Sequence, residues 1–197
     1  ICFMSKTLSH RKVFISKEIP EVGVSILEKA GMDVTIHQGD VPLTTGEMTE
    51  HLKGYHALLS VGHNKLDQHT LEKCGHLKVI SQFGVGYDNI DVKKATELGI
   101  VVANTPLAMN DATADIAFGL MIATSRKMFY MHKKILKGEW GDFRSQSNLG
   151  FELKNKTLGI LGLGRIGEEM AKRCKGAYDM YVIYHNRSRN KNAESSL

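Results

Sequence analysis

Short apolar runs alternate with amphipathic segments along the first half of the chain. Runs rich in Val, Ile and Leu have the length and composition of buried strands, and the segments between them carry apolar residues at helical spacing. Strands are expected at Val13–Ile15, Val34–Ile36, Ala57–Leu59, Leu77–Ile80 and Ile100–Val102. Helices are expected at 20–30, after a cap at Thr45, at 67–74 and at 91–98. This alternation predicts a parallel, doubly wound α/β layer structure.

A long segment with a different pattern follows the break at Asn104–Pro106. Residues 111–137 contain no proline and one glycine, and apolar residues recur at about every third or fourth position. The spacing predicts one helix of about seven turns. An irregular arm is expected at 139–148, around the single tryptophan, Trp140. Such a helix fits a bridge between domains or subunits and a core helix equally well.

A second strand-helix-strand unit begins at Thr157. The pattern predicts a strand at Thr157–Leu161, a helix at Arg165–Lys175 and a strand at Met180–Tyr184, and the polar tail 190–197 is expected to fray. We therefore expect two domains, residues 1–104 and residues 105–197. Because the chain starts at Ile1 and stops soon after the last strand, we expect it to be a piece of a longer product.

Composition narrows the class of protein. With 42% hydrophobic and 24% charged residues, the chain is typical of soluble globular proteins, and neither a membrane span nor a signal sequence is expected. The three widely spaced cysteines predict a reducing, cytoplasmic location. The net charge of +5 is spread among acidic residues, which argues against nucleic acid as a partner. The nine histidines show no metal-ligand spacing.

The strongest chemical signal is Gly162-Leu163-Gly164-Arg165-Ile166-Gly167, a G-x-G-x-x-G pattern that follows a predicted strand and opens a predicted helix. In a dinucleotide site, Gly162 permits the tight turn, Gly164 lets a pyrophosphate approach the backbone, and Gly167 lets the helix pack closely on its strand. Backbone amides at the start of the helix then bind the phosphates. The alternative is a glycine-rich turn without a ligand, which this placement disfavours.

The end of the next strand predicts which dinucleotide binds. An NAD site places Asp or Glu about 20 residues after the first glycine, where the carboxylate accepts hydrogen bonds from the ribose. This chain has His185-Asn186-Arg187-Ser188-Arg189 there. Two guanidinium groups and a hydroxyl suit a 2′-phosphate, so we expect NADP(H) to be preferred, with NAD(H) possible. The alternative is that both arginines are ordinary solvated residues.

A second glycine-containing segment, Ser81-Gln82-Phe83-Gly84-Val85-Gly86-Tyr87-Asp88-Asn89-Ile90-Asp91, follows a predicted strand. Ligands of open α/β sheets bind at the carboxyl ends of the strands. The glycines on either side of Val85 would let successive amides converge on a small carboxylate. On spacing alone, a structural turn is at least as good an interpretation.

Taken together, these segments resemble the D-isomer-specific 2-hydroxyacid dehydrogenases, and most closely their glyoxylate/hydroxypyruvate reductase branch. The other matching segments are Asn104-Thr105-Pro106, Asp111-Ala112-Thr113-Ala114-Asp115 and the stretch from Lys156 to Gly167. The resemblance implies a flavodoxin-like substrate domain followed by the first half of a Rossmann NAD(P)-binding domain. It also implies reduction of a small 2-oxoacid, glyoxylate or hydroxypyruvate, to the D-2-hydroxyacid.

The resemblance also implies roles for particular residues. The amides of Val85 and Gly86 would hold the substrate carboxylate. The pyrophosphate would lie along Gly164, Arg165 and Ile166, and the 2′-phosphate would face Arg187, Ser188 and Arg189. The long helix and the Trp140 arm resemble the family's homodimer contact.

The resemblance places the catalytic Arg, the catalytic His and its acidic partner in the second half of the cofactor domain. No residue of this chain matches them, so we expect the chain alone to be inactive. Two alternatives to an enzyme are a non-enzymatic, dinucleotide-sensing corepressor and a truncated regulatory isoform. A corepressor of this kind would carry an acid at the end of the second Rossmann strand, and the sequence has none there.

Overall fold

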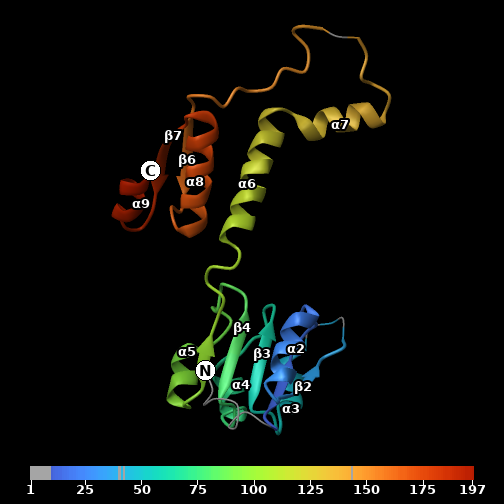
Figure 1. The fold of residues 1–197 in the computed structure, drawn as a ribbon, viewed down its shortest axis with the longest axis vertical. Helices are drawn as coiled ribbons and strands as arrows, with labels where there is room; N and C mark the ends of the chain where they lie inside the picture. Colours follow the sequence, from blue (N-terminus) through green and yellow to red (C-terminus); the bar gives the residue numbers. More distant parts are fainter. Residues whose placement is uncertain (1–9, 40, 42, 143) are drawn as a thin grey trace. The chain divides into compact units, whose positions relative to one another are not determined.

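The computed structural model describes residues 10–39, 41, 43–142 and 144–197. The chain divides into two compact units, Ile1–Ala108 and Met109–Leu197 (Figure 1). The sequence places the boundary after residue 104, and the roles of the two parts remain proposals. None of the described helices is long and apolar enough to cross a bilayer.

The first unit is built on a parallel sheet. Its strands are β1 (Lys12–Ile15), β2 (Asp33–Ile36), β3 (Ala57–Val61), β4 (Val79–Phe83) and β5 (Val101–Ala103). Within the described residues they pair in the order β2-β1-β3-β4-β5, and every pair is parallel. This is the flavodoxin-like order, so the expected fold class is confirmed for this unit. The fourth strand was expected at Leu77–Ile80, and β4 instead starts at Val79 and continues to Phe83.

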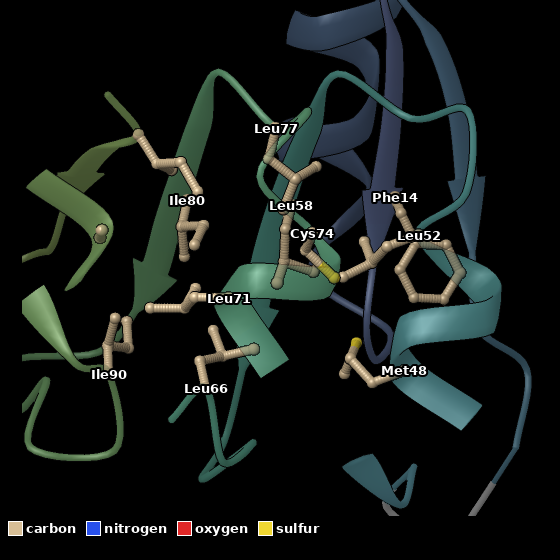
Figure 2. Close-up of a cluster of buried hydrophobic side chains, with 12 residues drawn as sticks. Phe14, Met48, Leu52, Leu58, Leu66, Leu71, Cys74, Leu77, Ile80 and Ile90 are labelled. Carbon is tan, nitrogen blue, oxygen red and sulfur yellow. The ribbon is translucent and has the colours of Figure 1, made fainter. Parts of the chain in front are cut away.

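Helices lie on both faces of this sheet, and the main core is on one of them. The helices are α2 (Glu21–Lys29), α3 (Thr45–His51), α4 (Gln68–Lys73) and α5 (Val92–Glu97). Side chains of α3, α4 and α5 pack against the sheet side chains Phe14, Leu58 and Ile80 (Figure 2). Leu52, Leu71 and Ile80 are completely buried there. The opposite face packs against α2, whose Ile26 and Leu27 line an apolar hollow together with Leu59 of β3.

Local capping sets where these helices begin. Helices α4 and α5 begin where the sequence predicts them, and the side chains of Asp67 and Asp91 cap them. The cap of α3 is Thr44 and not Thr45, because the Thr44 hydroxyl and the Glu47 carboxylate form a reciprocal capping box. The hydrogen bond from the Thr70 backbone is the main reason that the pKa of Asp67 falls to about 2. This cap therefore remains charged over the whole neutral range.

The second unit begins with two helices where the sequence predicts one. Helix α6 (Asn110–Ser125) ends at Arg126, and α7 (Met128–Leu136) starts after Lys127, whose φ of 54° is left-handed. The prediction of one continuous helix is therefore wrong. No Gly or Pro marks the break. The break coincides with a long-range contact: the Ser125 carbonyl accepts a 2.6 Å hydrogen bond from the Phe151 amide.

The close approach at the break depends on Gly150. A Cβ on Gly150 would lie 2.5 Å from the Ser125 oxygen, so only glycine lets the two backbones meet there. The described residues of the arm between α7 and the next strand contain no helix or strand, as expected. Trp140 in this arm is 59% exposed.

The remainder of the second unit is a strand-helix-strand motif. Strands β6 (Thr157–Leu161) and β7 (Tyr181–His185) pair in parallel, and α8 (Arg165–Tyr178) connects them. This topology confirms the first half of a Rossmann unit. The tail is not frayed as expected: α9 (Lys191–Ser196) is capped by the Asn190 side chain, and its Ala193 is fully buried.

Candidate functional site

The glycine-rich turn between β6 and α8 gives each of its three glycines a different environment. Gly162 has a φ of 97°, a conformation that L-residues rarely adopt. Gly167 lies so close to the start of the turn that a Cβ there would be 2.5 Å from the Gly162 oxygen. Both positions therefore require glycine because of the fold of this chain itself.

Gly164 differs from the other two. Its φ of −97° is accessible to any residue, and a Cβ built there meets no atom within 4 Å. Packing within the described chain therefore gives no reason for glycine at this position. A backbone left bare at the first turn of a 14-residue helix suits a phosphate group. Gly164 lines a surface hollow of about 440 Å³, whose other wall residues are Leu161, Gly162, Leu163, His185, Asn186, Arg187 and Ser188.

Asn186 fixes the shape of this turn. Its Oδ1 accepts a 2.7 Å hydrogen bond from the Leu163 amide, and its Nδ2 donates to the Leu163 carbonyl at 3.2 Å. The Nδ2 of Asn190 donates to the same carbonyl at 2.9 Å. Sequence reasoning assigned no role to either asparagine. The available signal was an asparagine at the end of the second strand, where a polar side chain can hydrogen-bond the neighbouring turn.

The three residues expected to face a 2′-phosphate divide into two groups. Arg187 and Ser188 line the hollow. The guanidinium of Arg189 instead forms an ion pair with Glu194 of α9, with Nη2 2.7 Å from Oε2. Of the remaining expected residues, Arg165 and Ile166 form the first two positions of α8, and neither lines the hollow.

Glu194 of α9 does not line this hollow, but it binds Arg189 and its pKa is strongly lowered. Its carboxylate accepts hydrogen bonds from the Arg189 guanidinium and from the Tyr184 hydroxyl. These bonds, with that of Arg189 first, lower the pKa of Glu194 to about 2. The same contacts raise the pKa values of Tyr184 and Arg189. Sequence reasoning did not include Glu194, because it lies in the tail that was expected to fray.

The glycine loop of the first unit follows β4 at the carboxyl edge of the sheet. The Asn104 side chain donates a 2.7 Å hydrogen bond to the Val85 carbonyl, and the Thr105 amide donates a 3.0 Å bond to the Gly84 carbonyl. Asn104 and Thr105 thus hold this loop in place from the end of β5. The carbonyls of Gly84 and Val85 are thus both hydrogen-bonded. The amides of Val85 and Gly86, in contrast, donate no hydrogen bond within the described residues.

The acidic segment at the start of α6 has a structural role. Arg173 of α8 pairs with Asp115 through Nε at 2.8 Å and with Asp111 through Nη2 at 3.0 Å. It also pairs with Glu169 in its own helix. Hydrogen bonds to Asp111 and Asp115 are the main reason that the pKa of Arg173 is raised. These contacts fasten α6 to α8 beside the apolar cluster that includes Met121 and Cys174.

Comparison with known families decides the class of protein. The model for the D-isomer specific 2-hydroxyacid dehydrogenase catalytic domain matches residues 13–194. The chain belongs to the D-isomer specific 2-hydroxyacid dehydrogenase family. The match confirms the resemblance inferred from the glycine turns and from the segments at 104–106 and 111–115.

Curated relatives in this family include archaeal glyoxylate reductases. The enzyme of Thermococcus litoralis is 40% identical over 190 residues, which cover 94% of this chain and 57% of that protein. The enzyme of Pyrococcus furiosus is 38% identical, with 94% and 56% covered. The chain thus spans a little over half the length of these relatives.

Several solved structures share the fold. The TT0316 protein of Thermus thermophilus superposes with a TM-score of 0.84 at 31% identity, covering 91% of this chain and 57% of that one. A glyoxylate reductase from Paecilomyes thermophila gives 0.77 at 31% identity, covering 94% and 58%. A protein from Polaromonas, described as a putative NAD-binding member of the family, gives 0.82 at 29% identity, covering 94% and 58%.

Proposed function

We propose that this 2-hydroxyacid dehydrogenase chain forms the substrate-binding unit and the adenosine-binding half of an NADPH-dependent reductase. The enzyme would convert a small 2-oxoacid, glyoxylate or hydroxypyruvate, to the D-2-hydroxyacid, and it would act in the cytoplasm, which the cysteine pattern favours. The observation that carries the proposal is the bare backbone at Gly164, which packing among the described residues does not explain. Relatives that are 40% and 38% identical carry the name glyoxylate reductase, which supports the choice of substrate class.

The residues of the second unit fit a phosphorylated dinucleotide. Gly164, Arg165 and Ile166 would lie along the pyrophosphate at the start of α8, with Gly162 and Gly167 keeping the turn tight. Arg187 and Ser188 would bind a 2′-phosphate from the wall of the hollow, and Arg189 would offer a second guanidinium. When bound, the dinucleotide supplies the hydride for reduction of the carbonyl. The adenosine half would be held by the hollow beside Gly164.

The first unit would bind the other substrate. A carboxylate needs donors, and the consecutive amides of Val85 and Gly86 lie in a loop at the carboxyl edge of the sheet, where such ligands bind. Asn104 and Thr105 bind the Val85 and Gly84 carbonyls. In a trans peptide the N–H points opposite to the carbonyl, so the amides of Val85 and Gly86 face away from Asn104 and Thr105. We assign none of the described residues to proton donation or to clamping of the carbonyl.

We also propose a homodimer through α6, α7 and the arm. Only Ala114 and Ala123 of α6 are buried, whereas large apolar side chains on these elements are at least half exposed. They are Ile116, Leu120, Met128, Phe129, Tyr130, Ile135, Leu136 and Trp140. Exposed apolar patches are typical of protein interfaces, which supports this proposal.

The cofactor proposal is tested by titrating the purified chain with NADPH and with NADH and measuring the heat of binding by calorimetry, which does not require contact with the nicotinamide ring. We expect NADPH to bind more tightly, and Arg187→Gln to weaken NADPH by about tenfold while changing NADH less than about twofold. Equal affinity for the two dinucleotides, unchanged by Arg187→Gln, would contradict the NADP preference. The reaction is tested with protein expressed from the complete coding sequence, by NADPH oxidation with glyoxylate or hydroxypyruvate. No turnover of either substrate would contradict the proposed activity.

A further inference from the structure

The side chain of Arg189 is held by an acid of the same chain. Its Nε lies 2.9 Å from Oε1 and 2.8 Å from Oε2 of Glu194, and its Nη2 lies 2.7 Å from Oε2. This two-pronged arrangement is the geometry in which guanidinium and carboxylate groups bind most specifically. The Glu194 side chain is 29% exposed and that of Arg189 is 71% exposed. Glu194 is therefore the more buried partner of the pair, and most of the Arg189 side chain is in contact with solvent.

The backbone of Arg189 nevertheless lies beside the hollow at the glycine turn. The residue before it, Ser188, lines the hollow, and the residue after it, Asn190, donates a hydrogen bond to the Leu163 carbonyl of the turn. The position is therefore anchored next to the hollow on both sides. The Arg189 side chain itself turns toward Glu194 of α9 and does not line the hollow.

A second contact holds Glu194 in place independently of Arg189. The Tyr184 hydroxyl donates to Oε1 of Glu194, and it accepts a 3.0 Å hydrogen bond from the Asn190 amide. Because the pKa of Glu194 is about 2, its carboxylate is charged throughout the neutral range. An incoming anion therefore competes with a carboxylate that is already ionised and positioned.

We propose that Glu194 determines how strongly this site prefers a 2′-phosphorylated dinucleotide, by holding Arg189 in an internal ion pair. This inference rests on the proposed NADP(H) site. Arg187 and Ser188 meet the 2′-phosphate directly, and Arg189 contributes only after it has given up its bonds to Glu194. Removing the Glu194 charge would release Arg189 and would also remove a negative charge that repels the phosphate. Both effects strengthen binding of NADPH and leave NADH nearly unchanged.

The test is Glu194→Gln, which keeps the size of the side chain and removes its charge. Dissociation constants for NADPH and NADH are measured by calorimetric titration of the purified protein. We expect Glu194→Gln to bind NADPH about fivefold more tightly, with NADH changed less than about twofold. The gain should shrink at high salt, because it comes from exposed charges.

A double-mutant cycle tests whether Arg189 carries the gain. Arg189→Gln alone should weaken NADPH less than about twofold, since the guanidinium is occupied by Glu194. In the Glu194→Gln background, the same Arg189→Gln change should cancel most of the gain. Glu194→Asp, which retains the charge, should restore NADPH affinity toward that of the unmodified protein.

Two controls separate this role from a structural one. Glu169→Gln removes the same charge from an equally exposed side chain that pairs with Arg173. Tyr184→Phe removes the other hydrogen bond to Glu194 and leaves the Arg189 pair intact. We expect neither to change the ratio of NADPH to NADH affinity by more than about twofold.

The outcomes separate this inference from the proposed function. Absence of NADPH binding by the unmodified protein would overturn the proposed function. Normal NADPH binding with an affinity ratio unchanged in Glu194→Gln would overturn the inference alone. Strong loss of NADPH binding in Arg189→Gln would also overturn it, because Arg189 would then contact the phosphate with Glu194 in place. If Tyr184→Phe gave the same gain in NADPH affinity as Glu194→Gln, the effect would come from the position of α9 and not from the charge of Glu194, and the inference would be overturned.

Discussion

The carbonyl oxygen of Gly162 lies within 2.5 Å of the point where a Cβ on Gly167 would stand. Helix α8 therefore rests directly on the turn that starts it. The Cγ2 of Ile160 in β6 would also be only 3.2 Å from that Cβ. Close packing of strand, turn and helix fixes the direction of the first amides of α8, which are the groups proposed to meet the phosphates.

Gly167→Ala should destabilise the second unit. The new methyl group must push α8 away from the Gly162 carbonyl, and overpacking of this kind costs about 1 to 3 kcal/mol. Denaturant unfolding followed by circular dichroism measures the change. Gly176→Ala in the same helix meets no atom within 4 Å and should instead stabilise α8 by about 0.5 to 1 kcal/mol. Equal effects of the two substitutions would contradict the close contact at Gly167.

Gly164→Ala should weaken cofactor binding and leave stability nearly unchanged. Because the new Cβ meets nothing in the described chain, we expect the free energy of unfolding to change by less than about 0.5 kcal/mol. The methyl group would stand where the pyrophosphate approaches, so NADPH should bind about tenfold more weakly. Unfolding and NADPH titration on the same sample separate the two effects. Unchanged NADPH affinity would show that no ligand comes close to this position.

Asn186→Ala should loosen the glycine turn. It removes two hydrogen bonds to Leu163, each worth about 1 kcal/mol in a typical protein. We expect a loss of about 1 to 2 kcal/mol in stability and weaker binding of NADPH and NADH alike. Asn192→Ala, on the exposed side of α9, serves as the matched control and should change neither quantity. If Asn186→Ala weakened NADPH and not NADH, Asn186 would contact the 2′-phosphate directly, and the prediction that it only positions the turn would be contradicted.

Docking of α9 should depend on pH through Glu194. Its pKa is lowered from 4.5 to about 2 in the folded chain, mainly by the hydrogen bonds from Arg189. The folded state therefore binds fewer protons, and the stabilisation is fully present above about pH 4.5 and is lost as the pH falls toward 2. The melting temperature of the unmodified protein should exceed that of Glu194→Gln above pH 4.5, and the two should converge toward pH 2. A difference that stays constant over this range would contradict the ion pair.

Features set by local pattern could be predicted from the sequence. Apolar runs located the strands, and Asp67 and Asp91 marked the starts of α4 and α5, because a cap acts within one turn. The G-x-G-x-x-G turn was found for the same reason. Its residues are consecutive, and the conformational demands on Gly162 and Gly167 arise within six positions.

Features that depend on distant contacts could not be predicted. The break at Lys127 coincides with the approach of Phe151 and Gly150 to Ser125, and nothing near Lys127 in the sequence signals it. The order of the tail depends on Glu194 meeting Arg189 and Tyr184 across a turn. The role of Asp111 and Asp115 likewise became clear only once α8 brought Arg173 against them.

The most direct test of the central claim is an amide chemical-shift titration of the ¹⁵N-labelled protein with NADPH. The account predicts saturable shifts of the Gly162, Gly164 and Arg165 amides, together with the Arg187 and Ser188 amides at the hollow. NADH should shift the amide signals of the glycine turn only at higher concentration, and it should shift the Arg187 and Ser188 amides less than NADPH does. If saturating NADPH leaves the Gly164 amide unmoved, the turn does not bind a dinucleotide and the proposed function is wrong.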